Sequence, residues 1–155
     1  MNPLPIFKVW LGACAMSLLM VGATQAADQG SAADAEAMVK RAVAYIKANG
    51  PEKAYEEFTN GKSFKDRGLY VIVNDMNGKS LAHGGNPKLV GKELGTLKDA
   101  DGKPIFPMFL EAIKGKDRGW TADYKFLNPA TQKIEIKASF FERVGDTNVG
   151  VGIYK

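Results

Sequence analysis

The chain has 155 residues, of which 45% are hydrophobic and 25% are charged, an ordinary composition for a globular protein. The net charge at pH 7 is +4, and the basic residues are scattered among acidic ones, which argues against a nucleic-acid-binding protein. The single cysteine, Cys14, lies near the amino terminus, so the rest of the chain excludes a disulfide scaffold, a thiol nucleophile and a cysteine-ligated metal.

Residues 1–26 have the pattern of a secretory signal peptide. Lys8 supplies the positive flank, residues 9–23 are uncharged and mostly apolar, and the small residue Ala26 precedes the expected cleavage point. We therefore expect the mature chain to be exported. The alternative is that residues 9–27 are retained as a membrane anchor, since that stretch approaches the length needed to cross a bilayer.

A polar linker, residues 27–33, precedes a single domain that we assign to residues 34–155. Apolar residues then recur at spacings of three and four, which predicts a long amphipathic helix. These residues are Ala35, Met38, Val39, Ala42, Tyr45 and Ile46. Asn49 lies at the end of this helix, and Pro51 begins a second, shorter one. We expect the long helix to pack on a sheet rather than on a membrane, because its polar face carries both signs of charge.

Residues 69–74 form an unbroken run of β-branched and aromatic residues, which predicts a strand that is buried on both faces. A turn at residues 75–78 leads into a second strand, residues 79–83. The turn resembles the beginning of a calcium-binding loop. It lacks the spaced acidic ligands and the closing glutamate of such a loop, so we interpret it as a hairpin turn.

Residues 84–104 are irregular and rich in glycine, and a connection of this length inside a compact domain is usually functional or disordered. Several leucines can anchor it, so we expect an ordered lid with a short helix near residues 93–97. A further helix is predicted at residues 104–114, with its aromatic residues facing inward.

Three strands are predicted in the last part of the chain, at residues 118–127, 133–143 and 147–154. The order of the elements predicts an α+β domain built on a single five-stranded antiparallel sheet. We expect the long amino-terminal helix on one face of this sheet and the loop and helix lid on the other.

The two faces of the carboxy-terminal strands differ in chemistry, because a strand sends alternate side chains to opposite sides. Residues assigned to the lid side are Trp120, Ala122, Tyr124, Phe126, Lys137, Ser139, Phe141, Gly150, Gly152 and Tyr154. The opposite face of the strand at residues 133–143 is apolar and is assigned to the long helix; it consists of Ile134, Ile136, Ala138 and Phe140. The two glycines would leave empty volume above the sheet, and a buried Lys137 would be costly unless an anion met it. A small carboxylate satisfies both features, with Trp120 and Tyr124 as walls and His83 as a second hydrogen-bond donor.

Evidence for an enzyme is weak, because the sequence has one histidine, no nucleophile elbow and no cluster of metal ligands. A Schiff base formed by Lys137 is the one catalytic hypothesis that remains. We therefore expect no catalytic residues, no metal and no cofactor. The stronger alternative is a structural or protein-interaction module of the cell envelope, in which the lid packs tightly on the sheet and no small molecule binds.

Four segments of the chain resemble the single Cache domain, the extracytoplasmic sensing module of bacterial chemoreceptors and histidine kinases. They are YVIVNDMNGKSLAHGGNPKLVGKEL, LKDADGKPIFPMFLEAIKGKDRGW, DYKFLNP and VGVGIYK. The resemblance covers about residues 39–155 and implies a PAS-like sheet that recognises a small organic acid such as acetate, propionate, pyruvate or lactate without catalysis. It also implies a periplasmic location, signal transduction or chemotaxis through a membrane receptor or histidine kinase partner, and a homodimer through the amino-terminal helix.

The same resemblance implies which residues contact the ligand. By position, the contacts fall on His83, Trp120, Tyr124 and Lys137, with Tyr70, Met108 and Phe109 as pocket walls. Phe126 stands where the family pattern has a tryptophan. Membrane-bound members of the family continue into a transmembrane helix and an output domain. Because this sequence ends at Lys155, we expect a free-standing exported form.

Overall fold

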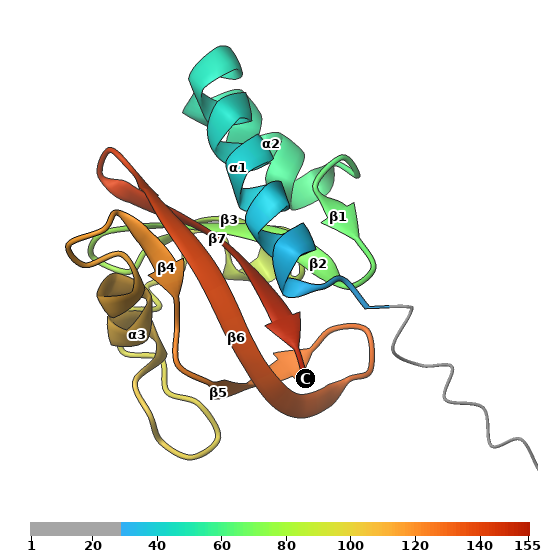
Figure 1. The fold of residues 1–155 in the computed structure, drawn as a ribbon, viewed down its shortest axis with the longest axis vertical. Coiled ribbons are helices and arrows are strands. Elements are labelled where there is room, and N and C mark those ends of the chain that lie inside the picture. Colours follow the sequence, from blue (N-terminus) through green and yellow to red (C-terminus); the bar gives the residue numbers. More distant parts are fainter. Residues whose placement is uncertain (1–28) are drawn as a thin grey trace, which may run out of the picture.

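The computed structural model describes residues 29–155, and the predicted signal segment lies outside this range. Two helices, α1 (Ala32–Asn49) and α2 (Pro51–Asn60), lie side by side on one face of a sheet (Figure 1). Gly50 joins them with a φ of 81°, a conformation that glycine adopts without strain. None of the helices in residues 29–155 is both long and apolar enough to cross a bilayer.

The amino-terminal end of α1 is fixed by a capping box. The Ser31 hydroxyl accepts a hydrogen bond from the backbone N–H of Asp34, and the Asp34 carboxylate accepts one from the backbone N–H of Ser31. The buried stripe of the helix follows the predicted spacing. It consists of Ala35, Met38, Val39, Ala42, Val43 and Ile46. The predicted long helix is therefore confirmed.

The strands form one antiparallel sheet, and two further short helices connect them. The elements are β1 (Lys65–Asp66), β2 (Leu69–Asp75), β3 (Ser80–His83), η1 (Pro87–Leu89), α3 (Ile105–Ala112), β4 (Arg118–Trp120), β5 (Tyr124–Asn128), β6 (Lys133–Val144) and β7 (Thr147–Tyr154). In the centre of the sheet β2 pairs with β7 and β7 pairs with β6. Both β1 and β3 pair with β2, and both β4 and β5 pair with β6. The predicted α+β fold with an antiparallel sheet is confirmed, but within residues 29–155 the sheet has seven strands rather than five, because β1 is added at one edge and the strand predicted at residues 118–127 is divided into β4 and β5.

Two apolar layers lie on the two faces of this sheet. One joins the buried stripe of α1 to Ala54 and Phe58 of α2 and to the sheet. The other lies under α3 and contains Phe106, Phe109 and Phe141. Figure 1 shows α1 and α2 on one side of the strands and α3 with its flanking loops on the other. The predicted arrangement of helix and lid is therefore found, and the lid-side layer contains the candidate site.

The strand predicted at residues 118–127 is interrupted between β4 and β5. Trp120 pairs with Phe140, whereas Tyr124 pairs with Lys137, so this edge contains one residue more than the facing part of β6. An extra residue of this kind reverses which side chains face each side of the sheet. The predicted parity therefore holds from Tyr124 onward but fails at Trp120.

Trp120 consequently lies on the α1 side of the sheet, not under the lid. Its indole Nε1–H donates to Glu36 Oε1 of α1 at 2.7 Å, and its ring packs on Phe140 with centroids 5.6 Å apart. The expectation that Trp120 walls the same pocket as Tyr124 is corrected by this placement.

Two further details of the prediction are wrong. Ile134 and Ile136 were expected under the long helix, but they are 55% and 45% exposed, because that part of β6 extends beyond the start of α1. No helix forms at residues 93–97 within the described lid; η1 lies earlier, and bridges from Lys79 to Glu93 and from Lys98 to Pro104 shape the segment. The predicted turn at residues 75–78 is present, with the Asp75 carboxylate accepting from two backbone N–H groups of that turn.

The approach of β4 to α3 predicts an effect of the substitution Gly119→Ala. A Cβ at Gly119 would collide with the backbone oxygen of Ala112, and backbone cannot move aside as a side chain can. We expect a loss of about 1–3 kcal/mol in the free energy of unfolding, measured by urea denaturation. Gly61→Ala is the matched control, because its Cβ would meet only the carboxylate of Glu57, a long side chain that can rotate away. Equal effects of the two substitutions would contradict this packing.

Candidate ligand-binding site

The candidate site is built on the lid-facing side of β5, β6, β7, β2 and β3. Lys137 on β6 pairs with Tyr124 on one side and with Tyr154 on the other, so the three side chains share one face. On the neighbouring rungs, Ser139 pairs with Gly152 and Ile72 pairs with His83. Residues far apart in sequence therefore meet around the side chain of Lys137.

Lys137 is only 2% exposed, and its side chain extends across β7 toward β2. Its Nζ donates to the hydroxyl of Tyr70 at 2.7 Å and to the hydroxyl of Tyr154 at 3.2 Å. This path requires glycine at position 152, because a Cβ there would collide with Cε of Lys137. The empty volume predicted above the two glycines is therefore not found: Lys137 and Ser139 occupy it at Gly152, and the ring of Phe141 occupies it at Gly150.

No carboxylate of residues 29–155 forms an ion pair with Lys137. The rings of Tyr70, Tyr154 and Phe126 surround Nζ at centroid distances of 4.5, 4.6 and 5.3 Å, a geometry that favours an ammonium ion. Burial acts in the opposite direction and lowers the pKa of Lys137 to about 7. The site therefore holds a buried amine that carries or loses its charge close to neutral pH.

Four hydroxyl groups surround the side chain of Lys137. Tyr70 and Tyr154 are 3.0 Å apart at their hydroxyl oxygens, and Tyr154 also donates to the backbone oxygen of Leu127 at 2.9 Å. On the other side of Lys137, the hydroxyls of Tyr124 and Ser139 are 2.7 Å apart. Burial raises the pKa of all three phenols, that of Tyr154 to about 12, so they remain neutral at physiological pH.

His83 lies at the end of β3, where the chain enters the lid. Its Nδ1 accepts a hydrogen bond from the backbone N–H of Asn86 at 2.9 Å, which places the ring proton of the neutral form on Nε2. Burial, followed by the nearby charge of Lys137, lowers the pKa of His83 to about 3. The histidine is therefore neutral at physiological pH, with an Nε2–H that can donate.

Lys137, Tyr124 and His83 border a largely enclosed cavity of about 30 Å³. Its lining residues are Ile72, Asn74, His83, Leu89, Leu94, Leu97, Ile105, Phe106, Phe109, Tyr124, Phe126 and Lys137. Larger and more open hollows occur beside Tyr154, with about 220 Å³, and along α1, with about 840 Å³. We take the small cavity as the site because the buried cation faces it, and enclosure strengthens the interaction of a cation with a ligand.

Within residues 29–155 the structure contains no group of three or more histidine, cysteine, aspartate or glutamate side chains that could hold a metal ion. The polar side chains that line the cavity are the amine of Lys137, the imidazole of His83, the phenol of Tyr124 and the amide of Asn74. The first three offer N–H or O–H donors suited to an anion, whereas the Asn74 amide nitrogen already donates to Asn148.

Most of the predicted site residues meet at this cavity. Four of them line it: His83, Phe109, Tyr124 and Lys137. A fifth, Tyr70, accepts a hydrogen bond from Nζ of Lys137. Met108 packs on the same apolar layer but is not among the lining residues. As described above, Trp120 lies on the opposite face.

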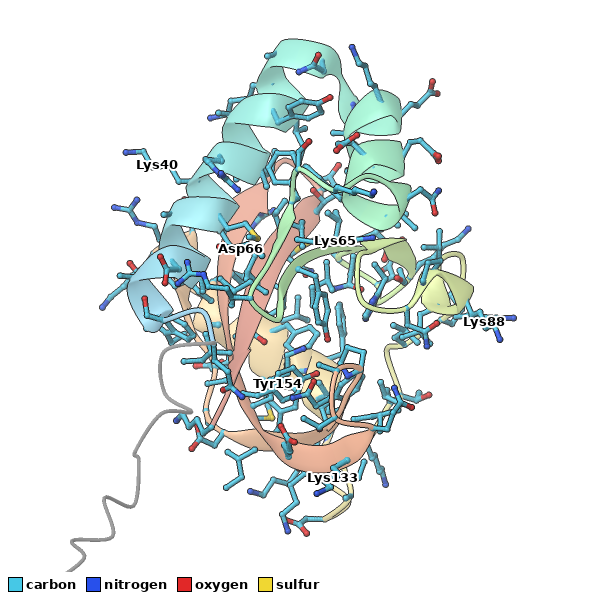
Figure 2. The ribbon with its side chains drawn as sticks, turned by 90° about the vertical axis from the view of Figure 1, so that its right-hand side faces the viewer. Lys40, Lys65, Asp66, Lys88, Lys133 and Tyr154 are labelled. Carbon is cyan, nitrogen blue, oxygen red and sulfur yellow. The ribbon has the colours of Figure 1, made fainter. Side chains whose placement is uncertain are left out.

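Tyr154 is a site residue that the prediction did not name. Figure 2 shows it inside the lower half of the domain, above Lys133 at the lower edge. Its parity was assigned correctly, but only the register of β6 against β7 shows that its hydroxyl reaches Lys137. The pairing of a buried lysine with a tyrosine directly opposite was the signal that could have revealed it.

Comparisons with known proteins agree with this architecture. The family profile described as Single Cache domain 2 matches residues 14–154. The methyl-accepting chemotaxis protein McpP of Pseudomonas putida is 26% identical over 91 residues, which are 57% of this chain but only 16% of that receptor.

Solved structures are similar in fold. A methyl-accepting chemotaxis protein from Vibrio parahaemolyticus superposes with a TM-score of 0.64 at 22% identity, covering 79% of this chain and 86% of that one. A periplasmic sensor domain of a chemotaxis protein gives a TM-score of 0.60 at 24% identity, with 77% and 86% covered. A Cache chemosensory domain described for its carboxylic acid recognition also gives 0.60, at 22% identity, with 77% and 84% covered. The match of the family profile to nearly the whole described domain, together with this shared fold, shows that the chain belongs to the single Cache domain family.

Proposed function

We propose that this domain is a non-catalytic, exported sensor or binding domain for a small organic acid of the acetate, propionate, pyruvate or lactate class. The observation that supports the proposal is the buried amine of Lys137, which has no carboxylate partner in the described domain and borders an enclosed cavity. A ligand carboxylate would supply the missing counter-charge, and a buried ion pair with further hydrogen bonds is far less costly than a buried lone charge.

The remaining donors fit the two oxygens of one carboxylate. Nε2–H of His83 is the ring donor left after Nδ1 has accepted from Asn86. When Ser139 donates to Tyr124 across their 2.7 Å contact, the phenol keeps its own hydrogen for a ligand. Charge-assisted hydrogen bonds of this kind are roughly twice as strong as neutral ones.

The rest of the cavity sets the size and polarity of the ligand. Leu97, Phe106 and Phe109 present apolar surface to it, which suits a short hydrocarbon tail. A volume of about 30 Å³ holds about two water molecules, so only the smallest acids fit without movement of the lid. The proposed class is therefore the short monocarboxylates rather than amino acids or sugars.

The same comparisons support a signalling role, because the solved relatives include sensor domains of chemotaxis proteins. We propose that the bound state is read by a membrane receptor or a histidine kinase partner. Pairing of two copies through the outer face of α1 is part of this proposal, and sedimentation of the purified protein with and without ligand would test it. The proposed periplasmic location follows from the sequence pattern of residues 1–26.

Addition of a short monocarboxylate is expected to stabilise the protein against heat. At a ligand concentration one hundred times the dissociation constant, the stabilisation should be about 2.7 kcal/mol, because the ligand binds only the folded state. A thermal-shift series of acetate, propionate, pyruvate and lactate measures it, with acetamide as a neutral control of nearly the same shape as acetate. If no acid changes the melting temperature, the alternative of a structural envelope module without a ligand is favoured instead.

The substitution Lys137→Met is expected to abolish binding while the fold is retained. Methionine fills a similar volume, and replacing a buried charge by an apolar side chain is often neutral or stabilising. Loss of a buried charged partner should weaken binding by at least about 2 kcal/mol, or roughly thirtyfold in Kd, measured by isothermal titration calorimetry.

Lys133→Met is the matched control for this substitution. Lys133 lies on the same strand but is exposed, so its replacement should leave Kd unchanged. Undiminished binding by the Lys137→Met variant would show that the site is elsewhere, even if the ligand class is right.

A further inference from the structure

The hydrogen atoms around Lys137 Nζ can be counted within the described domain. Tyr154 uses its own hydrogen on the backbone oxygen of Leu127, so at its contacts with Tyr70 and Lys137 its oxygen accepts. Tyr70 therefore donates to Tyr154, and its oxygen accepts from Nζ at 2.7 Å. Two N–H groups of Lys137 are thus assigned, and each donates a hydrogen bond to a phenol oxygen.

Two is the number of hydrogens on a neutral amine. An ammonium ion carries a third N–H, and a buried donor without an acceptor costs about 1–3 kcal/mol, or more when it is charged. Lys137 lines the cavity, so an acceptor bound there would lie beside the lysine side chain. A carboxylate oxygen there would accept the third hydrogen.

The titratable groups that face Lys137 from each neighbouring element provide no charged acceptor. They are Tyr70 on β2, His83 on β3, Tyr124 on β5 and Tyr154 on β7, all neutral at pH 7. The lid and α3 contribute apolar side chains to the cavity.

Two carboxylates on segments adjoining the site are bound to other groups. Glu135, two residues away on β6, accepts from the side chains of Asn128 and Thr131. Asp99 of the lid accepts from the backbone N–H groups of Asp101, Lys103 and Lys125.

We propose that carboxylate binding and protonation of Lys137 are coupled, so that the site takes up a small organic acid together with one proton from solvent. This inference rests on the proposed function. In the empty site the amine is neutral, with both hydrogens on Tyr70 and Tyr154. In the bound site the solvent proton completes an ammonium ion, whose third N–H donates to the carboxylate oxygen.

This exchange keeps the enclosed cavity free of net charge in both states. A permanent ammonium would be an uncompensated buried charge before binding, and a neutral amine would leave the carboxylate uncompensated after it. The aromatic rings at 4.5–5.3 Å from Nζ stabilise the charged form without neutralising it. They therefore lower the free energy needed to protonate the amine, so that a weakly bound ligand can supply the rest.

Coupling to a proton makes binding depend on pH in a defined direction. Burial lowers the pKa of Lys137 to about 7 in the empty site, and the carboxylate raises it in the complex. Below about pH 7 the amine is already charged and the affinity is constant. Above it, each pH unit weakens binding about tenfold, until the pKa of the complex is reached. The facing phenols and His83 titrate outside this window.

The test is calorimetric titration of the purified protein with sodium acetate and with sodium propionate, both of which stay ionised between about pH 6 and 8. Each titration is repeated in phosphate and in Tris, whose different heats of ionisation report the protons exchanged. From a pKa of about 7, we expect uptake of about 0.9 proton per acid at pH 8 and about 0.1 at pH 6, with Kd about tenfold weaker at pH 8.

Two variants sharpen this test. Lys137→Arg keeps a permanent charge, so any binding it shows should take up no proton and should not vary with pH. Tyr154→Phe removes one acceptor of Nζ while retaining the ring, so the ammonium loses stabilisation and the weakening of binding should begin at a lower pH than in the parent protein. The exposed Lys133→Met variant should match the parent protein in both measurements.

The outcomes separate the coupling from the function. Binding with equal Kd at pH 6 and 8 and no buffer-dependent heat overturns the coupling and leaves the proposed sensor role standing. Absence of binding of either acid at both pH values overturns both. Binding that weakens at pH 8 with uptake of close to one proton supports the coupling, provided that the Tyr154→Phe variant shifts the onset in the stated direction.

Discussion

The lid side of this domain depends on one interaction, the contact of a buried lysine amine with two tyrosine hydroxyls across three strands. Lys137 of β6 reaches over β7 to Tyr70 of β2, and Tyr154 of β7 lies directly opposite it. Water is excluded from the group by the apolar layer under α3. The described domain supplies hydrogen bonds to the amine but no negatively charged partner. This missing counter-charge is the basis of the proposed preference for an anionic ligand.

A single extra residue on the edge of the sheet places Trp120 and Tyr124 on opposite faces. The break between β4 and β5 turns Trp120 toward Glu36 of α1 and Tyr124 toward Ser139. Trp120 thus attaches the sheet edge to the long helix, while Tyr124 walls the cavity. In a regular strand the two side chains would share one face, and the anchoring of α1 and the shaping of the site could not both be achieved by them.

Much of this architecture was predictable from the sequence, because apolar periodicity reports local structure directly. The buried stripe of α1 and the continuous apolar run of β2 were identified in this way. Alternation along β6 also placed Lys137 on the lid face. What could not be predicted depends on register, since a one-residue irregularity leaves no compositional mark and yet reverses Trp120. The contact of Tyr154 with Lys137 could not be predicted for the same reason, because the register of β7 against β6 decides which side chains lie opposite each other.

The glycine beneath the lysine has an evolutionary consequence. Position 152 has no room for a side chain because Cε of Lys137 and the hydroxyl of Ser139 both lie where its Cβ would be. The three positions are therefore linked: a descendant that acquires a larger residue at 152 must displace both the extended lysine and the serine, and one that shortens position 137 alone still has the serine in the way. A glycine at 152 together with a lysine at 137 and a serine at 139 is therefore the combination to expect wherever a domain of this kind keeps its amine beneath the lid.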